Sequence, residues 1–178
     1  MKRHLFLTGS IGCGKSTAIT VALGEKITQC GGFLTRRYRD PYLHFTLESP
    51  DGNVKRTFLD FASGKPEVDL AVFSKKDLHG ETLVLDEIGG IELLNPEFAS
   101  ALEAVLSSGI PILGVLKGEG AAGALIDKLG LTEEYQLAAG KLRQQLRSDP
   151  NTCLVEMTGR DDENARNAIH QWVAEFAQ

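Results

Sequence analysis

The segment that most constrains this chain is residues 9–16, which read Gly-Ser-Ile-Gly-Cys-Gly-Lys-Ser. They match the pattern G-x-x-x-x-G-K-[S/T]. An apolar run, HLFLT, precedes the segment, and apolar residues at helical spacing follow it, which is the context that the pattern requires. A strand that leads through such a loop into a helix is typical of α/β proteins, so this segment indicates an α/β fold.

Residues 9–16 form a phosphate-binding loop, or P-loop, pattern, and their residue types suit a polyphosphate. Glycines let the backbone turn its amides inward, and the N-terminus of the following helix adds a partial positive charge. Lys15 is expected to neutralise phosphate oxygens as a catalytic cation, and the Ser16 hydroxyl is expected to bind Mg²⁺. The predicted nucleotide-binding residues are Gly9, Ser10, Ile11, Gly12, Cys13, Gly14, Lys15, Ser16 and Thr17.

Strands and helices alternate along the rest of the chain. Continuous apolar runs in ETLVLDE, IPILGVL and CLVEM predict three more buried strands, and GFLTRRY, HFTLES and VKRTFLDF predict a β-ribbon or meander. Helical spacing predicts helices from Pro96 to Gly109, over 121–129, over 133–148 and from Ala165 to Phe176, and a weaker helix over 66–80.

This order predicts one P-loop NTPase domain over residues 1–178. The expected architecture is a three-layer α/β/α sandwich with a mostly parallel central sheet and a small β-ribbon. Residues 118–150 are a candidate lid or insertion.

Two carboxylates, Asp86 and Glu87, end the apolar run LVL. Carboxylates at the edge of a buried strand are costly unless something positive or polar meets them, and a metal ion does so. Asp86 is expected to hold the Mg²⁺, as a Walker-B aspartate does, and Glu87 to polarise the attacking water. The alternative is that the two carboxylates form a structural salt bridge or a helix cap. The presence of a P-loop in the same chain favours the metal site over this alternative.

The same residues also begin a D-x-x-G string, Asp86 to Gly89, of the kind that small GTPases use. A GTPase needs a guanine-specificity motif downstream, and the similar string Ser74-Lys75-Lys76-Asp77 lies upstream instead. A glutamate directly after the aspartate is typical of P-loop ATPases in which an additional strand separates the P-loop strand from the acidic strand. IPILGVL is expected to be that strand.

A second cation near the γ-phosphate accelerates phosphoryl transfer. Lys117 follows IPILGVL and is predicted to be a catalytic sensor of that phosphate; the alternative is an exposed loop lysine. Further candidates, each with the alternative of an ordinary exposed charge, are Arg36, Arg37, Arg39, Lys141, Arg143 and Arg147. Arg160, Asp161 and Asp162 are candidates for the edge of the base pocket, with helix capping as the alternative.

The charge, the apolar runs and the cysteines of the chain indicate which binding partners and which compartment to expect. The formal net charge is −5, so a general attraction to nucleic acids or anionic lipids is not expected. The apolar runs are too short for a membrane helix, the first residues do not resemble a signal peptide, and three cysteines lack metal-site spacing. We expect a cytoplasmic protein whose partner is a nucleoside triphosphate, with no nucleic acid or membrane partner; a protein partner is left undefined.

Several short sequence segments, taken together, identify a protein family more specifically than the P-loop alone. They are the P-loop, Gly32-Phe33-Leu34-Thr35, Arg39-Asp40, and Asp86-Glu87-Ile88-Gly89 followed by Glu92-Leu93. In these segments the chain resembles the small nucleoside-triphosphatase family, of the cancer-related nucleoside-triphosphatase and archaeal-bacterial NTPase type, over nearly its whole length. The resemblance implies Mg²⁺-dependent hydrolysis of ATP, GTP and other nucleoside triphosphates to diphosphates. The chain differs from the family at Arg36-Arg37, where an acidic residue is usual.

Three functions fit these residues. The first is a Mg²⁺-dependent nucleoside triphosphatase in which Glu87 activates water. The second is a nucleotide or small-molecule kinase with the same P-loop, in which Glu87 binds an acceptor under a lid at 118–150. The third is a non-catalytic switch that changes shape with the bound nucleotide. Phosphate release from MgATP or MgGTP separates the first from the other two.

Overall fold

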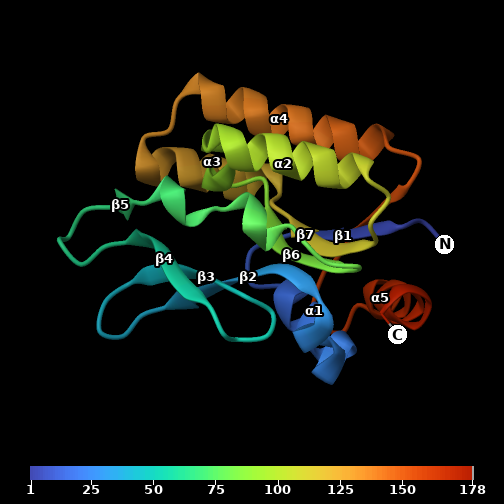
Figure 1. Ribbon diagram of the computed structural model, residues 1–178. Coiled ribbons are helices and arrows are strands. Elements are labelled where there is room, and N and C mark those ends of the chain that lie inside the picture. The colour runs from blue at the N-terminus through green and yellow to red at the C-terminus, as the bar shows by residue number, and fades with distance from the viewer. Residues whose placement is uncertain (178) are drawn as a thin grey trace.

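The strand that leads into the P-loop lies inside an eight-stranded sheet (Figure 1). The computed structural model describes residues 1–177, and its sheet has the order β5-β4-β3-β2-β6-β7-β1-β8. The five strands from β2 to β8 in this order pair in parallel, and β3, β4 and β5 extend the sheet in antiparallel fashion. The strands are β1 (His4–Thr8), β2 (Gly31–Tyr38), β3 (His44–Glu48), β4 (Lys55–Asp60), β5 (Glu67–Val68), β6 (Leu83–Ile88), β7 (Ile112–Leu116) and β8 (Thr152–Glu156).

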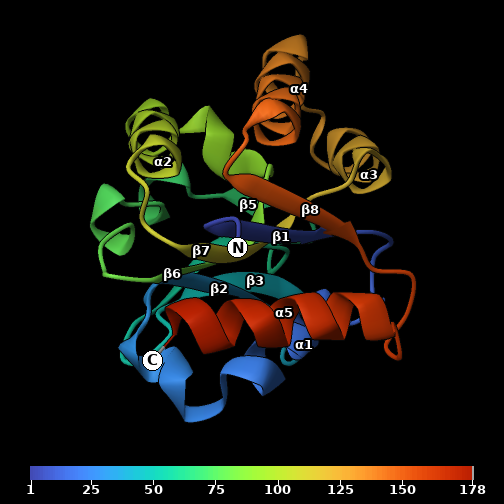
Figure 2. The same cartoon turned by 90° about the vertical axis from the view of Figure 1, so that its right-hand side faces the viewer.

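Helices cover both faces of the parallel part of the sheet (Figure 2). One face carries α1 (Lys15–Leu23) and α5 (Glu163–Phe176). The other carries α2 (Pro96–Ser107), α3 (Glu119–Leu129) and α4 (Glu133–Ser148). This arrangement confirms the predicted α/β sandwich with a mostly parallel sheet and an antiparallel ribbon.

The alternation of side chains along a strand explains the two layers of core. In β1, Phe6 packs into the core beneath α2 and α4, whereas Leu5 and Leu7 pack into the core beneath α1 and α5. Successive residues of a strand point to opposite faces, so a strand covered on both sides must be apolar throughout. The continuous apolar runs noted in the sequence are therefore the inner strands.

The strand order places the candidate residues at one edge. β7 lies between β1 and β6, as expected for the additional strand formed by IPILGVL. The carboxyl ends of parallel strands meet at the same edge, where ligands of open α/β sheets bind. The P-loop after β1, Asp86 and Glu87 in β6, and Lys117 after β7 all lie there.

One predicted element is wrong. Residues 66–80 form the short strand β5 and two 3₁₀ turns, η2 (Leu70–Val72) and η3 (Lys75–Asp77), instead of a helix. The side chains of Asp69 and Ser74 accept hydrogen bonds from nearby backbone amides, which favours turns over a continued helix. Buried Val72, Phe73 and Leu78 hold these turns against the core.

Of two smaller boundaries, one agrees with the predictions and one differs. The helix that begins at Pro96 has Ser107 as its last residue, and Gly109, which was expected to end it, lies just beyond with a left-handed φ of +77°. The helix predicted from residue 121 begins at Glu119. The short connections are completed by η1 (Gly24–Gln29) and η4 (Ile91–Leu94).

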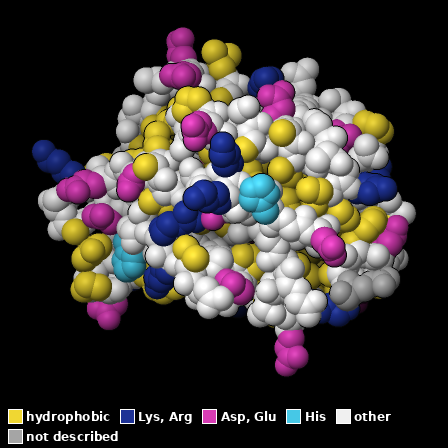
Figure 3. Space-filling model, viewed as in Figure 1, with side chains coloured by type: hydrophobic (Ala, Val, Ile, Leu, Met, Phe, Trp, Pro, Cys, Tyr) yellow, Lys and Arg dark blue, Asp and Glu magenta, His cyan; other side chains and the backbone are white. Residues whose placement is uncertain are grey.

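The surface agrees with the modest net charge. On the face drawn in Figure 3, acidic and basic side chains are interspersed with apolar ones. Within residues 1–177, no helix is both long and apolar enough to cross a bilayer.

Candidate active site

Close packing shapes the P-loop. Gly9 has a φ of +130°, and a Cβ at this position would lie 2.3 Å from the carbonyl oxygen of Met157. Gly14 is left-handed and caps the start of α1, so the chain can turn from the loop into the helix. A side chain at Gly9 would force the loop away from Met157, the residue that follows β8, and one at Gly14 would strain the left-handed turn into the helix.

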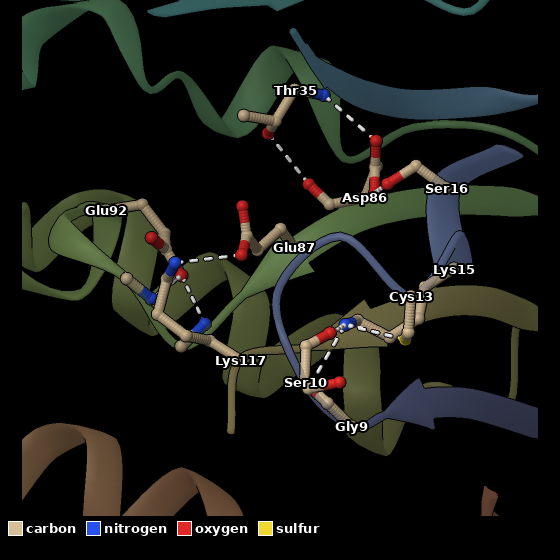
Figure 4. A network of polar contacts seen from close by, with 12 residues as sticks. Gly9, Ser10, Cys13, Lys15, Ser16, Thr35, Asp86, Glu87, Glu92 and Lys117 are labelled. Carbon is tan, nitrogen blue, oxygen red and sulfur yellow. Dashed lines mark hydrogen bonds and ion pairs between the residues drawn. The ribbon is translucent and has the colours of Figure 1, made fainter. Parts of the chain in front are cut away.

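Lys15 folds over the loop that precedes it (Figure 4). Its ammonium group donates hydrogen bonds to the carbonyl oxygens of Gly9, at 3.0 Å, and Ser10, at 2.7 Å, and it lies 3.5 Å from Cys13 Sγ. The cation is therefore held at the mouth of the loop. Cys13 itself is buried.

Ser16 and Asp86 meet across the sheet edge. The Ser16 hydroxyl donates a hydrogen bond of 2.7 Å to Asp86 Oδ1, although the two residues are 70 positions apart in the chain. The Asp86 side chain is nearly inaccessible, and only 1% of the residue is exposed. Burial raises the pKa of Asp86 to about 6, although the Ser16 hydroxyl and the Arg36 guanidinium favour the ionised carboxylate.

Strand β2 supplies the other partners of Asp86. Thr35 donates a hydrogen bond from its hydroxyl to the Asp86 carbonyl oxygen, at 2.8 Å, and its backbone N–H lies 3.4 Å from Asp86 Oδ2. Arg36 Nη1 lies 3.3 Å from the same Oδ2. Arg36 is thus the basic residue of β2 that the structure brings to the predicted metal ligand.

Glu87 has an unusual backbone. Its φ is +70°, and it is the only residue other than glycine with a positive φ within residues 1–177. Such a conformation costs free energy and tends to occur at functional sites. The turn aims the carboxylate at Lys117, whose Nζ lies 2.9 Å from Glu87 Oε1. The two predicted catalytic side chains therefore form an ion pair.

The loop after β6 is fixed from two sides. Buried Glu92 accepts hydrogen bonds from the backbone N–H groups of Gly89, at 2.6 Å, and Gly90, at 2.9 Å. Burial raises the pKa of Glu92, and these amides and Lys117 oppose that shift. On the other side, the Tyr135 hydroxyl in α4 donates a hydrogen bond of 2.8 Å to the Gly89 carbonyl oxygen. Helix α4 is thereby tied to the residues that follow Glu87.

The oxygen ligands at Ser16 and Asp86 suit a magnesium ion. Mg²⁺ is a hard cation that takes one or two protein oxygens and shares the rest of its ligands with phosphates and water. Within residues 1–177, no three or more His, Cys, Asp or Glu side chains gather into a metal cluster. The residues that the structure brings together at this point are one hydroxyl and one buried carboxylate, and the chemistry of these oxygens fits Mg²⁺.

The basic residues of α4 have acidic partners. Arg143 and Arg147 lie 3.9 Å and 3.6 Å from Glu119 Oε1 of α3, and Lys141 lies 3.7 Å from Glu103 of α2. These contacts join the two halves of residues 118–150 and fasten them to α2. Exposed Lys141 and Arg147 correspond to the solvated, paired helix face that was the alternative interpretation, whereas Arg143 is only 15% exposed.

A cavity flanks the P-loop on the side of α1 and α5. It has a volume of about 360 Å³, and its lining includes Gly14, Thr17, Arg160 and Arg166. Asp162 caps α5 by accepting a hydrogen bond from the Ala165 N–H, at 3.0 Å, which was the expected alternative for the acids. Trp172 is fully buried in the core.

Three contacts at the site had not been indicated by the sequence patterns. The first is the bond that Thr35 donates to Asp86, the second is the pair of bonds that Glu92 accepts from the Gly89 and Gly90 N–H groups, and the third is the bond that Tyr135 donates to Gly89. Glu92 and Thr35 belong to the segments that resemble the small nucleoside-triphosphatase family, which marked them without giving a role. Tyr135 had no signal beyond its place in a helical pattern.

Comparisons with known proteins place the chain in a family. A family model described as NTPase matches residues 54–155. The human cancer-related nucleoside-triphosphatase is 30% identical, with 86% of this chain and 97% of that protein covered. The nucleoside-triphosphatase THEP1 of Thermotoga maritima is 29% identical over 132 residues, which cover 64% of this chain and 73% of that protein.

The fold has a solved counterpart. The crystal structure of THEP1 from the hyperthermophile Aquifex aeolicus superposes with a TM-score of 0.64 and 16% sequence identity. The match covers 98% of this chain and 99% of that one. At this identity, the likeness concerns the fold.

Proposed function

Because this chain belongs to the NTPase family, we propose that it is a hydrolase that converts nucleoside triphosphates to nucleoside diphosphates and phosphate. The observation that carries the proposal is the 2.7 Å hydrogen bond from Ser16 to Asp86, next to the strained Glu87. It brings the end of a phosphate-binding loop, a buried carboxylate and a candidate base to one point. The named relatives support hydrolysis in general, whereas the roles below are inferred from the residues.

The P-loop is proposed to hold the phosphates. Its backbone amides and the N-terminus of α1 attract phosphate oxygens, and Lys15 exchanges its bonds to the Gly9 and Ser10 carbonyls for bonds to phosphate. The cavity beside Gly14 and Thr17 is the proposed place of the nucleoside. Its arginines, Arg160 and Arg166, lie at the edge that the base would meet.

Ser16 and Asp86 are the proposed ligands of a magnesium ion. When bound, this ion supplies positive charge that stabilises the charge developing on the phosphate oxygens. Arg36 and Thr35 hold Asp86 so that its carboxylate faces Ser16.

Glu87 is the proposed general base. It takes a proton from the attacking water, whose oxygen bonds to the γ-phosphorus while the bond from that phosphorus to the bridging oxygen breaks. Lys117, 2.9 Å from Glu87, orients the carboxylate and adds a second positive charge on the side of the γ-phosphate. Glu92 and Tyr135 hold the following loop and thereby keep Glu87 in place.

Phosphate release from purified protein tests this proposal. MgATP, MgGTP, MgCTP and MgUTP are compared with the wild type, Lys15→Ala and Glu87→Gln. Hydrolysis in the wild type, its loss in both variants and retained nucleotide binding in Glu87→Gln support the proposal. Equal hydrolysis by the wild type and Lys15→Ala contradicts it, since the P-loop is then not the site.

A further inference from the structure

A separate cavity opens beside Glu87, away from the proposed nucleoside side of the P-loop. Its volume is about 280 Å³. Strands β2, β3 and β4, the turn η4 and helix α3 enclose it, and Ile11 of the P-loop, Glu87 and Lys117 border it. It is large enough for a small organic molecule, and the proposed mechanism places only the attacking water at its border with Glu87.

One wall of this cavity is aromatic. Phe33, Phe45, Phe58 and Phe73 all line it. The ring centroids of Phe45 and Phe58 are 6.3 Å apart, and those of Phe58 and Phe73 are 5.1 Å apart, so these rings form a continuous surface. Aromatic faces and edges favour contact with another flat ring.

Two cations complete the lining from opposite elements. Arg37 of β2 lies with its Cζ 5.8 Å from the centroid of Phe45, and Lys128 of α3 lies with its Nζ 5.8 Å from the centroid of Phe61. Among residues 1–177, the ion pairs leave Arg37 and Lys128 without a carboxylate partner within 4.0 Å. Aromatic contact thus holds both basic groups at the cavity, where their charge is available to a ligand.

We propose that this cavity is a binding site for a small planar aromatic anion. Its ring packs against the phenylalanine wall, and its negative group meets Arg37 and Lys128. Charge complementarity selects the anion, because the other ionisable side chains of the lining already have partners. Glu87 pairs with Lys117, Arg36 pairs with Asp86, and buried Glu92 accepts hydrogen bonds from two backbone N–H groups.

A ligand in this cavity is expected to inhibit the proposed hydrolysis, because Glu87 borders both the cavity and the site of reaction. A molecule in the cavity occupies space next to Glu87, where the attacking water must lie, and hydrolysis therefore slows. This effect lowers kcat and leaves the KM for the nucleotide unchanged, since the P-loop stays free. The effect on hydrolysis rests on the proposed function, whereas binding of the anion does not.

The test uses 1-naphthoate as the anionic probe and 1-naphthalenemethanol as its uncharged analogue. Calorimetric titration of the full chain, both without nucleotide and saturated with MgADP, is expected to give at least about ten-fold tighter binding of naphthoate than of the uncharged analogue. Arg37→Ala and Lys128→Ala are each expected to weaken it by about three- to ten-fold. Lys141→Ala, which removes an exposed lysine on α4, is the matched control and is expected to leave binding unchanged.

A filled cavity supplies an independent variant. Ala124 lines the cavity but is exposed on α3, so Ala124→Trp inserts a ring with little effect on the core. The variant is expected to lose naphthoate binding while its thermal unfolding midpoint stays near that of the wild type. It is also expected to resist the slowing of MgNTP hydrolysis by naphthoate.

The outcomes separate this site from the proposed function. Lys15→Ala is expected to bind naphthoate as the wild type does, even though it no longer hydrolyses nucleotide. If the wild type binds naphthoate but hydrolyses no nucleotide, the proposed binding site is supported and the proposed function is contradicted. The site is overturned by any of four results: no binding at millimolar naphthoate, equal affinity for the uncharged analogue, competition with the nucleotide, or wild-type binding in Arg37→Ala, Lys128→Ala and Ala124→Trp alike.

Discussion

Replacing Asp86 by asparagine removes a buried charge while keeping the shape of the side chain. In the wild type this carboxylate is 1% exposed, and burial raises its pKa from 3.8 to about 6. The ionised form is therefore less stable in the folded protein than in the unfolded chain. We expect Asp86→Asn to raise the free energy of unfolding near neutral pH and to abolish metal-dependent hydrolysis.

The size and sign of the effect follow from proton linkage. Below about pH 3.8 both states hold the proton, and the carboxylate costs nothing. As the pH rises, the unfolded chain loses this proton first, so the folded state is progressively penalised until about pH 6, where the full cost is present. A shift from 3.8 to about 6 corresponds to about 3 kcal/mol, of which about 2 kcal/mol develops between about pH 4.5 and 7.5.

Urea unfolding of the wild type and Asp86→Asn at about pH 4.5 and 7.5 measures this difference. The gain in stability of the variant over the wild type is expected to be about 2 kcal/mol larger at the higher pH. Constant effects of the amide, such as its contact with the Thr35 N–H, cancel between the two pH values. Asp127→Asn, the same chemical change at an exposed position on α3, is the matched control and is expected to show no such difference.

Two results would refute the reasoning. One is a stability difference between Asp86→Asn and the wild type that is the same at both pH values, which would mean that Asp86 has no raised pKa. The other is a smaller gain at the higher pH, which would mean that the folded state favours the ionised carboxylate.

Three further predictions follow from the site and the core. Chelation of Mg²⁺ by EDTA is expected to stop hydrolysis and added Mg²⁺ to restore it, and activity that persists in EDTA would remove the metal from the proposal. Tyr135→Phe leaves the buried Gly89 carbonyl oxygen without its donor, so urea unfolding should show a loss of about 1–2 kcal/mol, together with a lower kcat; an unchanged kcat would mean that this bond does not position Glu87. Phe98→Ala removes a fully buried ring that packs on Phe33 and Phe73 and is expected to cost about 3–5 kcal/mol, and a cost near zero would show that the core closes over the gap.

The features that the sequence predicted well are local or periodic. The P-loop is one continuous segment, and the inner strands are apolar over their whole length because helices cover both faces. The closeness of Ser16 and Asp86 was expected from the likeness of Asp86 to a Walker-B aspartate, and the shared edge of parallel strands explains it. The placement of β7 between β1 and β6 was predicted from the glutamate that follows Asp86. That prediction rested on the likeness to a class of P-loop ATPases and not on the spacing of apolar residues.

The features that it could not predict depend on side chains from distant elements. Arg36 and Asp86 are 50 residues apart, and Tyr135 and Gly89 are 46 apart, so no spacing relates them. Among three nearby arginines, only the register of β2 against β6 decides that Arg36 reaches Asp86. Residues 66–80 were misjudged because their apolar side chains are set by contacts with the core and follow no helical period.

The pairing of β1 has a consequence for the order in which the site can form during synthesis. β1 lies between β7 and β8, and the Met157 N–H donates a hydrogen bond of 2.8 Å to the Thr8 carbonyl oxygen just ahead of the loop. The phosphate-binding turn lies well ahead of β8 along the chain, with most of the strands and helices between them, yet part of its support comes from β8 and the residue after it. A growing chain that has not yet reached β8 therefore carries the whole motif without one of the neighbours that shape it, and we expect its phosphate-binding turn to become fully supported only after β8 has been made.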